Sequence, residues 1–198
     1  MLKHYPTQKL IAGCDEAGRG CLAGPVVSAA VILPKSFKNS SLNDSKITSE
    51  KNRKILYPLI KKESICWAIG ISSVEEIDKL NILNATFLSM HRAINKLTTR
   101  PEFLIIDGNR FNNHPEIQHK CIIKGDGKFI SIAAASILAK TYRDNIMKEL
   151  DERYPNYNWK NNKGYPTKQH RNSIDKYGIN IHHRRSFKLA TNQLILSL

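Results

Sequence analysis

The chain has 198 residues, 41% of them hydrophobic, and its 31 Lys plus Arg outnumber its 17 Asp plus Glu, which gives a formal net charge of +14. A chain of this length can bury one hydrophobic core, and no stretch reaches the roughly 18 consecutive apolar residues that a membrane-spanning helix needs. The first residues also lack the apolar centre of a signal peptide, so we expect a globular cytoplasmic protein without a membrane partner, whose positive charge favours a polyanion as ligand.

The first half of the chain alternates apolar runs with turn and capping signals. The elements predicted there, in chain order, are strands over 10–14 and 24–33, a helix from 48 or 49 to about 62, a strand over 64–72, a helix that opens with the capping box Ser73–Glu76, and a helix over 84–97. The turn between the first two strands is short. We therefore expect these two strands to pair antiparallel.

Apolar runs followed by glycine turns mark the second half of the chain. Phe103–Ile106 and Cys121–Ile123 are predicted as buried parallel strands. A long helix over Phe129–Arg153 follows, and its Ala133–Ala135 favours close packing on the sheet, while two short helices are predicted over about 167–177 and 188–196. The pattern indicates an α/β fold with a mixed sheet, antiparallel in its first strands and then parallel, flanked by helices.

Residues 156–198 differ from the rest of the chain in charge. They hold eight basic residues against one acid, Asp175, and the basic residues are Lys160, Lys163, Lys168, Arg171, Lys176, Arg184, Arg185 and Lys188. Aromatic residues lie between these cations, namely Tyr157, Trp159, Tyr165 and Tyr177. Because stacking on bases or sugars needs aromatic rings near positive charge, the segment is predicted to be a basic platform for a nucleic acid.

Cysteine and histidine give no metal-binding pattern. Cys14, Cys21, Cys66 and Cys121 are scattered without a Cys-x-x-Cys pair, so we expect buried reduced thiols rather than a zinc site. The neighbours His182 and His183 cannot face one ligand together on a regular element, and we expect them to be solvated or in contact with phosphate.

Four carboxylates share one kind of place in the sequence. Asp15 with Glu16, Asp107 and Asp126 each lie where an apolar run gives way to a turn that contains glycine. In α/β sheets such strand ends meet at the functional crevice, and carboxylates gathered there need a cation because like charges raise each other's pKa. Ligands that are all oxygen favour Mg²⁺ or Mn²⁺, and two such ions predict hydrolysis of a phosphodiester.

The adjacent acids Asp15 and Glu16 raise a geometric difficulty. Side chains alternate between the two faces of a regular strand, so these two carboxylates should point apart. Either the strand bends at Glu16, which Gly18 and Gly20 would ease, or Glu16 reaches the metal by another route.

The sequence from Gly13 to Val27 resembles the opening motif of ribonuclease HII, the bacterial type 2 ribonuclease H. Further blocks resemble the family in the same order, and they are Asp44-Ser45-Lys46, Ile106-Asp107-Gly108, Lys124-Gly125-Asp126, Ala133 to Lys140, Arg143-Asp144, Gly164 to Thr167 and His183 to Phe187. The resemblance implies a ribonuclease H-like catalytic domain over residues 1–155 and a small basic helical extension over 156–198.

The resemblance implies an endonuclease that hydrolyses RNA in RNA/DNA hybrids and cleaves on the 5′ side of single ribonucleotides in duplex DNA. The products would carry a 3′-hydroxyl and a 5′-phosphate. It implies four catalytic and metal-binding acids: Asp15 bridging two divalent cations, Glu16 and Asp107 flanking them, and Asp126 next to the cation on the nucleophile side.

Substrate contacts are also implied. The turn Gly18-Arg19-Gly20 is similar to the family's element that contacts the ribose, where glycine lets the backbone approach a 2′-hydroxyl. Tyr165 resembles the tyrosine that packs on the sugar at the junction. Lys46, Ser136 and Lys140 are expected to contact phosphate or the edge of the site, and phosphate contacts would position the duplex.

Two other functions remain open from the residues. A hybrid-binding protein on the same fold without cleavage is one, and the presence of all four acids counts against it. Another two-metal nuclease, such as a junction-resolving or exonucleolytic enzyme, is the second, and the Gly-Arg-Gly turn with Tyr165 counts against that one. We expect a monomer, and contact with a sliding clamp stays open.

Overall fold

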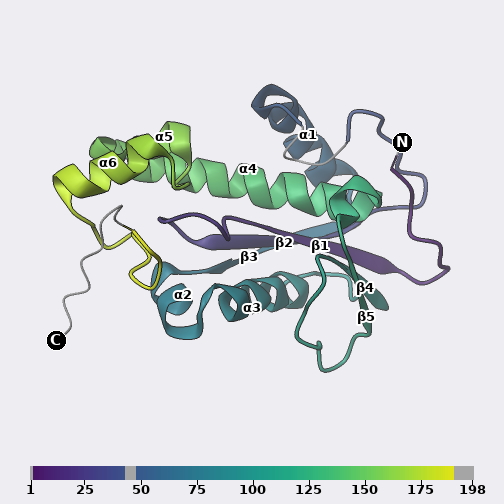
Figure 1. Cartoon of the computed structure of the whole chain (residues 1–198). Coiled ribbons are helices and arrows are strands. Elements are labelled where there is room, and N and C mark those ends of the chain that lie inside the picture. Colours follow the sequence, from purple (N-terminus) through teal and green to yellow (C-terminus); the bar gives the residue numbers. More distant parts are fainter. Residues whose placement is uncertain (1, 43–47, 190–198) are drawn as a thin grey trace.

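The computed structural model describes residues 2–42 and 48–189, and a mixed sheet of five strands runs through its centre (Figure 1). The strand order is β3-β2-β1-β4-β5, with β1 antiparallel to β2, β2 antiparallel to β3, and β4 parallel to both β1 and β5. The bounds are β1 (Ile11–Ala17), β2 (Val26–Ile32), β3 (Cys66–Ser72), β4 (Phe103–Asp107) and β5 (His119–Ile122). This confirms the predicted fold class.

Helices cover both faces of the sheet. α1 and α4 lie on one face and α2 and α3 on the other, while α5 and α6 lie at the C-terminal end of α4 (Figure 1). Their bounds are α1 (Glu50–Glu63), α2 (Val74–Leu80), α3 (Ile82–Asn95), α4 (Ile130–Arg153), α5 (Trp159–Asn162) and α6 (Lys168–Tyr177), with short 3₁₀ turns at Gly125–Gly127 and Pro155–Tyr157.

Capping residues define several of these helices as the sequence predicts. The Ser73 hydroxyl accepts from the Glu76 amide and the Glu76 carboxylate accepts from the Ser73 amide, so the capping box of α2 is present. Ser49 caps α1 and Thr167 caps α6. The helix predicted over about 188–196 falls almost entirely on residues outside the described part of the chain.

Two strand predictions differ from the structure. β1 continues to Ala17 instead of ending at Cys14, because its pairing with β2 stays regular up to Ala17 opposite Val27. β5 is parallel as predicted, but it is the edge of the sheet and only partly buried, and Ile123 just beyond it is 62% exposed.

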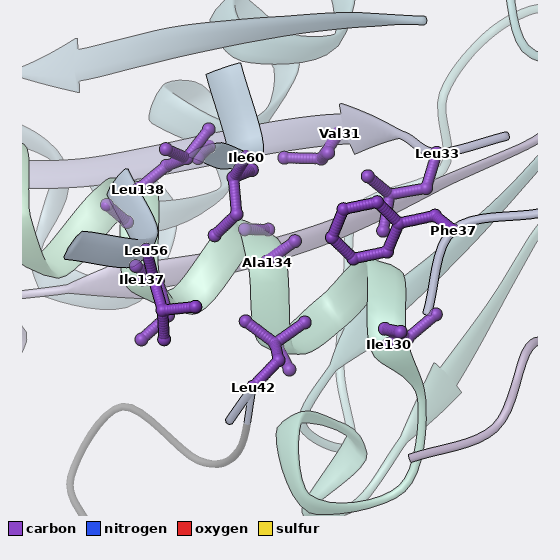
Figure 2. Close-up of a cluster of buried hydrophobic side chains, with 14 of the residues drawn as sticks. Val31, Leu33, Phe37, Leu42, Leu56, Ile60, Ile130, Ala134, Ile137 and Leu138 are labelled. Atoms are coloured by element: carbon purple, nitrogen blue, oxygen red, sulfur yellow. The ribbon is translucent and has the colours of Figure 1, made fainter. Parts of the chain in front are cut away.

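The main hydrophobic core lies between the sheet and the helices α4 and α1 (Figure 2). Small residues let α4 approach the sheet there, as the sequence predicts for Ala133–Ala135, which are fully buried. Gly13 of β1 carries the closest approach, since a Cβ built on it would lie 2.3 Å from the backbone carbon of Ser131. A second cluster fills the space between the sheet and α3.

The basic C-terminal segment has a core of its own, which corrects one prediction. Tyr157 and Trp159 are buried against Leu22 of the β1–β2 connection and Met147 of α4, so they are not available for stacking on a nucleic acid. The cation Lys163 is buried as well. A separate domain boundary at residue 155 stays a prediction.

The structure also bears on cysteine chemistry and on membrane spans. All four cysteines are free, with Cys121 half-buried and the other three buried, as expected for reduced thiols. No helix in the described ranges is long and apolar enough to cross a bilayer.

Candidate active site

Sheet register places two of the predicted acids side by side. β1 and β4 run parallel, and their last paired residues are Cys14 and Ile106. Asp15 and Asp107 each follow directly, at the same level on neighbouring strands. Because Cys14 and Ile106 both face the α3 side, alternation turns both acids toward α4. The parallel register is therefore what brings these carboxylates together.

Asp15 is buried, with 4% of its surface exposed. The Ser136 hydroxyl from α4 donates to its carboxylate, and the close contact of α4 with β1 at Gly13 allows Ser136 to reach it. Burial raises the pKa of Asp15 well above its usual range, and the negative charges of Glu16 and Asp107 raise it further. Burial and these neighbouring charges therefore disfavour the ionised form of Asp15.

Glu16 reaches the same pocket from the other face of the strand. The β1–β2 register is unbroken at Glu16 opposite Ser28, so the bend that the sequence suggested at this residue does not occur. The Glu16 carboxylate accepts from the Arg19 guanidinium at 3.2 Å. The chain changes direction only at Gly18, where φ is +100°.

Asp126, the fourth predicted acid, lies on the turn that follows β5. Its 3₁₀ turn follows β5, and the amide of Gly125 donates to the Asp107 carboxylate at 2.7 Å. Asp126 itself is 3% exposed, and its carboxylate accepts from the Gly127 amide at 3.0 Å. The turn that carries Asp126 is therefore bonded to Asp107.

The turn Gly18-Arg19-Gly20 borders the carboxylates and leaves no room for side chains at its first residue. A Cβ built on Gly18 would lie 2.1 Å from Nε of Arg143, and the φ of this residue is one that favours glycine. Arg143 comes from α4 and is completely buried. The sequence indicates glycine at this position but not the guanidinium behind it.

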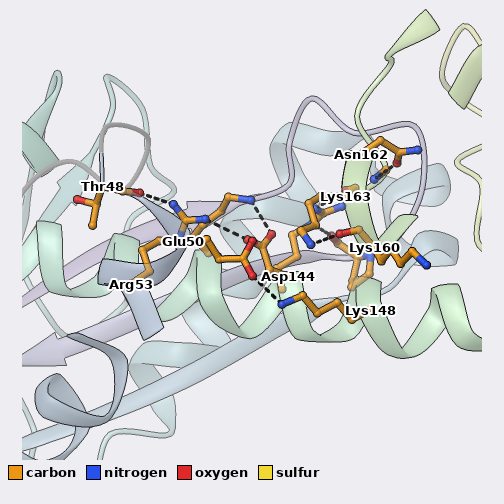
Figure 3. Close-up of polar contacts among 12 residues, drawn as sticks. Thr48, Glu50, Arg53, Asp144, Lys148, Lys160, Asn162 and Lys163 are labelled. Atoms are coloured by element: carbon orange, nitrogen blue, oxygen red, sulfur yellow. Dashed lines mark hydrogen bonds and ion pairs between the residues drawn. The ribbon is translucent and has the colours of Figure 1, made fainter. Parts of the chain in front are cut away.

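Lys140 and Tyr165 close the other side of the site. The Lys140 ammonium pairs with the Asp144 carboxylate at 2.5 Å and lies 5.8 Å from the centre of the Tyr165 ring. Asp144 also contacts Arg53 of α1 at 3.5 Å, within a row of ion pairs along α4 (Figure 3). These contacts hold Lys140 at the rim of the site.

Buried histidines support Tyr165 from behind, and this corrects the expectation for His183. The Tyr165 carbonyl accepts from Nδ1 of His170 at 2.9 Å, and Nε2 of His170 accepts from the Trp159 indole at 3.0 Å. His183 is 1% exposed, with its Nε2 3.3 Å from Nε2 of His170, while the Asn180 amide donates to its Nδ1 at 3.1 Å. His183 is thus part of the interior and not a phosphate ligand.

A pocket of about 210 Å³ lies at the end of the sheet and brings most of the predicted site residues together. Its lining residues are Asp15, Glu16, Ala17, Gly18, Arg19, Gly20, Asp107, Ser136, Lys140 and Tyr165. Asp126 is not among them, and Lys46 lies outside the described residues. The sequence analysis singled out Arg143 only as part of a block that resembles the family and did not predict its burial, and it missed the histidine support, because a charge pattern does not reveal which cations and imidazoles are buried.

The carboxylates share the pocket without forming a closed set of ligands. Within residues 2–42 and 48–189, no three Asp, Glu, His or Cys side chains converge tightly enough to hold an ion. The reason is visible in their present partners, since Asp107 is bonded to the Gly125 amide and Glu16 to Arg19.

A larger hollow of about 760 Å³ lies elsewhere, beside the beginning of β1. Its walls include Tyr5, Leu10 and Leu33, with Glu102 as its single acid. It lacks the carboxylate group that divalent-cation chemistry needs, so its size does not make it the better candidate.

Comparison with known proteins identifies close relatives. A family model described as Ribonuclease HII matches residues 12–190. The chain is similar to the Ribonuclease HII of Parabacteroides distasonis, with 61% identity over 99% of this chain and 98% of that one. It is also similar to the Ribonuclease HII of Bacteroides thetaiotaomicron, with 60% identity over 96% and 95% of the two chains.

Solved structures show the same fold. The ribonuclease H2 from Pyrococcus horikoshii OT3 has a TM-score of 0.75 at 23% identity, covering 91% of this chain and 94% of that one. The structure of a PCNA:RNase HII complex from Archaeoglobus fulgidus gives 0.74 at 26% identity, with 93% and 98% covered. Bst-RNase HIII in complex with Mn²⁺ gives 0.61 at 22% identity, covering 74% and 56%.

Proposed function

The chain belongs to the ribonuclease HII family of metal-dependent endonucleases that act on RNA/DNA hybrids, and from this premise we propose that it also cleaves on the 5′ side of single ribonucleotides in duplex DNA by a two-metal mechanism. One observation carries the proposal. Three carboxylates, the Gly-Arg-Gly turn and Tyr165 line one pocket, so groups suited to hydrolysis lie beside groups suited to contact a sugar.

The donor set at this pocket fits hard divalent cations. Asp15, Glu16 and Asp107 offer only carboxylate oxygens, and a bound cation would offset the burial and the neighbouring negative charges that raise the pKa of Asp15. We assign the metal ligands as Asp15, Glu16, Asp107 and Asp126. Bound Mg²⁺ or Mn²⁺ would supply Lewis-acid stabilisation of the phosphate and a lower pKa for the attacking water.

The remaining residues of the pocket act on position and charge. Ser136 orients Asp15 through its hydrogen bond, and Lys140 places a positive charge at the rim where a phosphate of the bound strand would lie. The chain is strongly basic, so the duplex would be drawn to the protein by its phosphates with an affinity that falls as salt rises.

Selectivity for ribose would come from backbone and ring contacts. Gly18 and Gly20 let the main chain approach the sugar, and the Tyr165 ring is 39% exposed beside them. A 2′-hydroxyl can both donate and accept a hydrogen bond, which distinguishes RNA from DNA at such a place. A structure-specific nuclease without ribose selectivity would have no use for this arrangement.

The proposal is tested by cleaving a labelled RNA/DNA hybrid and analysing the ends of the products. We expect cleavage with Mg²⁺ or Mn²⁺, none with chelator, and products with 3′-hydroxyl and 5′-phosphate ends. Hybrid binding measured in parallel separates the alternatives. Binding with no cleavage under any metal would favour the non-cleaving hybrid-binding protein instead.

A further inference from the structure

A second buried arginine holds the turn that borders the active site. Arg184 lies far along the chain but is completely buried against the β1–β2 connection. Its Nη2 donates to the Gly18 carbonyl at 2.7 Å and its Nη1 to the Arg19 carbonyl at 3.0 Å. Its Nε donates to the Gly24 carbonyl at 3.0 Å, so one guanidinium spans both ends of the connection.

Arg143 completes this support from the side of α4. It donates to the carbonyls of Ala23 at 2.9 Å and Pro25 at 3.0 Å. In the described part of the chain, every hydrogen bond made by these two guanidinium groups goes to a backbone carbonyl, and neither has a carboxylate within ion-pair distance. Burying two charged groups costs free energy unless their N–H donors are hydrogen-bonded. The carbonyls of the β1–β2 connection supply these hydrogen bonds.

The planar geometry of the peptide bond fixes the direction of the amide N–H groups that follow the carbonyls held by Arg184. Within a trans peptide unit the C=O of one residue points opposite to the N–H of the next, and residues 2–42 and 48–189 contain no cis peptide bonds. Since Arg184 holds the carbonyls of Gly18 and Arg19 inward, the amides of Arg19 and Gly20 point outward, where these residues line the pocket. Neither amide has an acceptor among the described residues.

We propose that Arg184 is a positioning residue for substrate selection, which fixes the amides of Arg19 and Gly20 as hydrogen-bond donors toward the sugar-phosphate of the strand being cleaved. This inference rests on the proposed cleavage at ribonucleotides. The guanidinium also polarises the two peptide units through its charge, which makes their amides stronger donors. Burial lowers the pKa of Arg184 to about 10, so it keeps this charge at neutral pH.

The test is the substitution Arg184→Lys, with Arg185→Lys as its matched control. Lysine keeps the charge, but one ammonium cannot span the carbonyls that the guanidinium reaches. Arg185 is the exposed neighbour, so the same change there leaves the turn intact. The two measurements are kcat/KM on a DNA duplex with one ribonucleotide, and Ki of the all-DNA duplex as a competitor.

For Arg184→Lys we expect kcat/KM on the ribonucleotide substrate to fall about tenfold or more, with Ki of the DNA duplex changed less than about twofold. For Arg185→Lys we expect any loss to affect both constants equally. Unchanged kcat/KM in Arg184→Lys, or a rise of Ki in parallel with the loss, would overturn the inference.

A second measurement on the unaltered protein keeps the test decisive if Arg184→Lys does not fold. With chelator present, the ¹H–¹⁵N signals of Arg19 and Gly20 should shift on adding the ribonucleotide duplex and shift less with the DNA duplex. Equal shifts with both duplexes would contradict the inference. Failure of the proposed function appears separately, as an unaltered protein that does not cleave the ribonucleotide duplex with metal.

Discussion

Asp107 illustrates how single residues in this site depend on their neighbours. It is the last residue of β4, it lies level with the buried Asp15, and its carboxylate accepts from the Gly125 amide of the turn that carries Asp126. Its charge is one of the causes that raise the pKa of Asp15. Asp107 thus links Asp15 to the turn that carries Asp126.

We predict that Asp107→Asn binds an RNA/DNA hybrid but cleaves it at least about a hundredfold more slowly, because an amide is a poorer ligand for a hard cation. Gel-shift titration and a timed cleavage assay on the same hybrid measure the two properties. Asp175→Asn removes an equal charge from an exposed position of α6 and should cleave normally. Cleavage by Asp107→Asn at the rate of the unaltered protein would remove this residue from the metal ligands.

Tyr165 offers a test of sugar selection at the same scale. We predict that Tyr165→Ala loses cleavage at a lone ribonucleotide more severely than it loses duplex binding, since we propose that the ring contacts the sugar and not the rest of the duplex. Tyr165→Phe keeps the ring and should keep most of the activity. The measurements are kcat/KM and Kd on one duplex, and an equal loss of both in Tyr165→Ala would argue against this role.

At the scale of elements, the close packing of α4 on β1 sets the distance between the carboxylates and Ser136. Gly13 makes this packing possible, because backbone atoms of Ser131 and Ile132 lie where its Cβ would be, at 2.3 and 2.5 Å. Neither element can move apart without opening the core that Figure 2 shows. The site therefore depends on a glycine that does not itself contact substrate.

Gly13→Ala should lower the free energy of unfolding by about 1–3 kcal/mol or more, because a backbone clash cannot be relieved by a side-chain rotation. Gly127→Ala is the control, since a Cβ there meets nothing within 4 Å. Urea denaturation of both variants gives the comparison. If Gly13→Ala proves as stable as the unaltered protein, α4 does not approach β1 as closely as described.

Sequence patterns predicted most of these elements, for reasons that particular residues show. The alternation of apolar runs and capping residues such as Ser73 is local, so strands, helices and the mixed sheet follow from it. The burial of Trp159 and Arg184 does not follow, because both sit among surface-like cations and find their partners far away in the chain. The extension of β1 through Asp15 and Glu16 was also missed, since acids usually mark the end of a strand.

At the scale of the whole molecule, the C-terminal segment and the start of the chain form one support for the site. Leu22 and Gly24 pair their backbone with Gly164, His182 and Arg184, so the turn after β1 is held by residues that come more than a hundred positions later. His183 lies inside this support. Loss of the support would therefore disturb both the carboxylates' neighbouring turn and Tyr165.

This arrangement predicts a pH dependence of stability. Burial, and then the charges of His170 and His182, lower the pKa of His183 from 6.5 to about 4. The unfolded chain therefore takes up a proton at His183 between these values while the folded chain does not, and the free energy of unfolding falls as pH drops from 6.5 to 4, by up to about 3 kcal/mol. Asp15 has a raised pKa in the folded state, so its contribution to the free energy of unfolding rises as the pH falls and opposes that of His183.

Comparison of the unaltered protein with His183→Gln isolates this contribution, because Asp15 is common to both. Urea denaturation at pH 7, 6, 5 and 4.5 should show a shallower loss of stability in the variant, since glutamine takes up no proton in this range. Parallel curves for the two proteins would mean that His183 is protonated in the folded state at its ordinary pKa.

The central claim is that the carboxylates and the sugar-contacting turn act together on one phosphodiester. Its most direct test is cleavage of a labelled DNA duplex that contains a single ribonucleotide, in Mg²⁺, in Mn²⁺ and in chelator, with the cut mapped to the nucleotide. We predict one cut on the 5′ side of the ribonucleotide with either metal and none with chelator. Cleavage of the all-DNA duplex at a similar rate, or no cut at the ribonucleotide with either metal, would contradict the account.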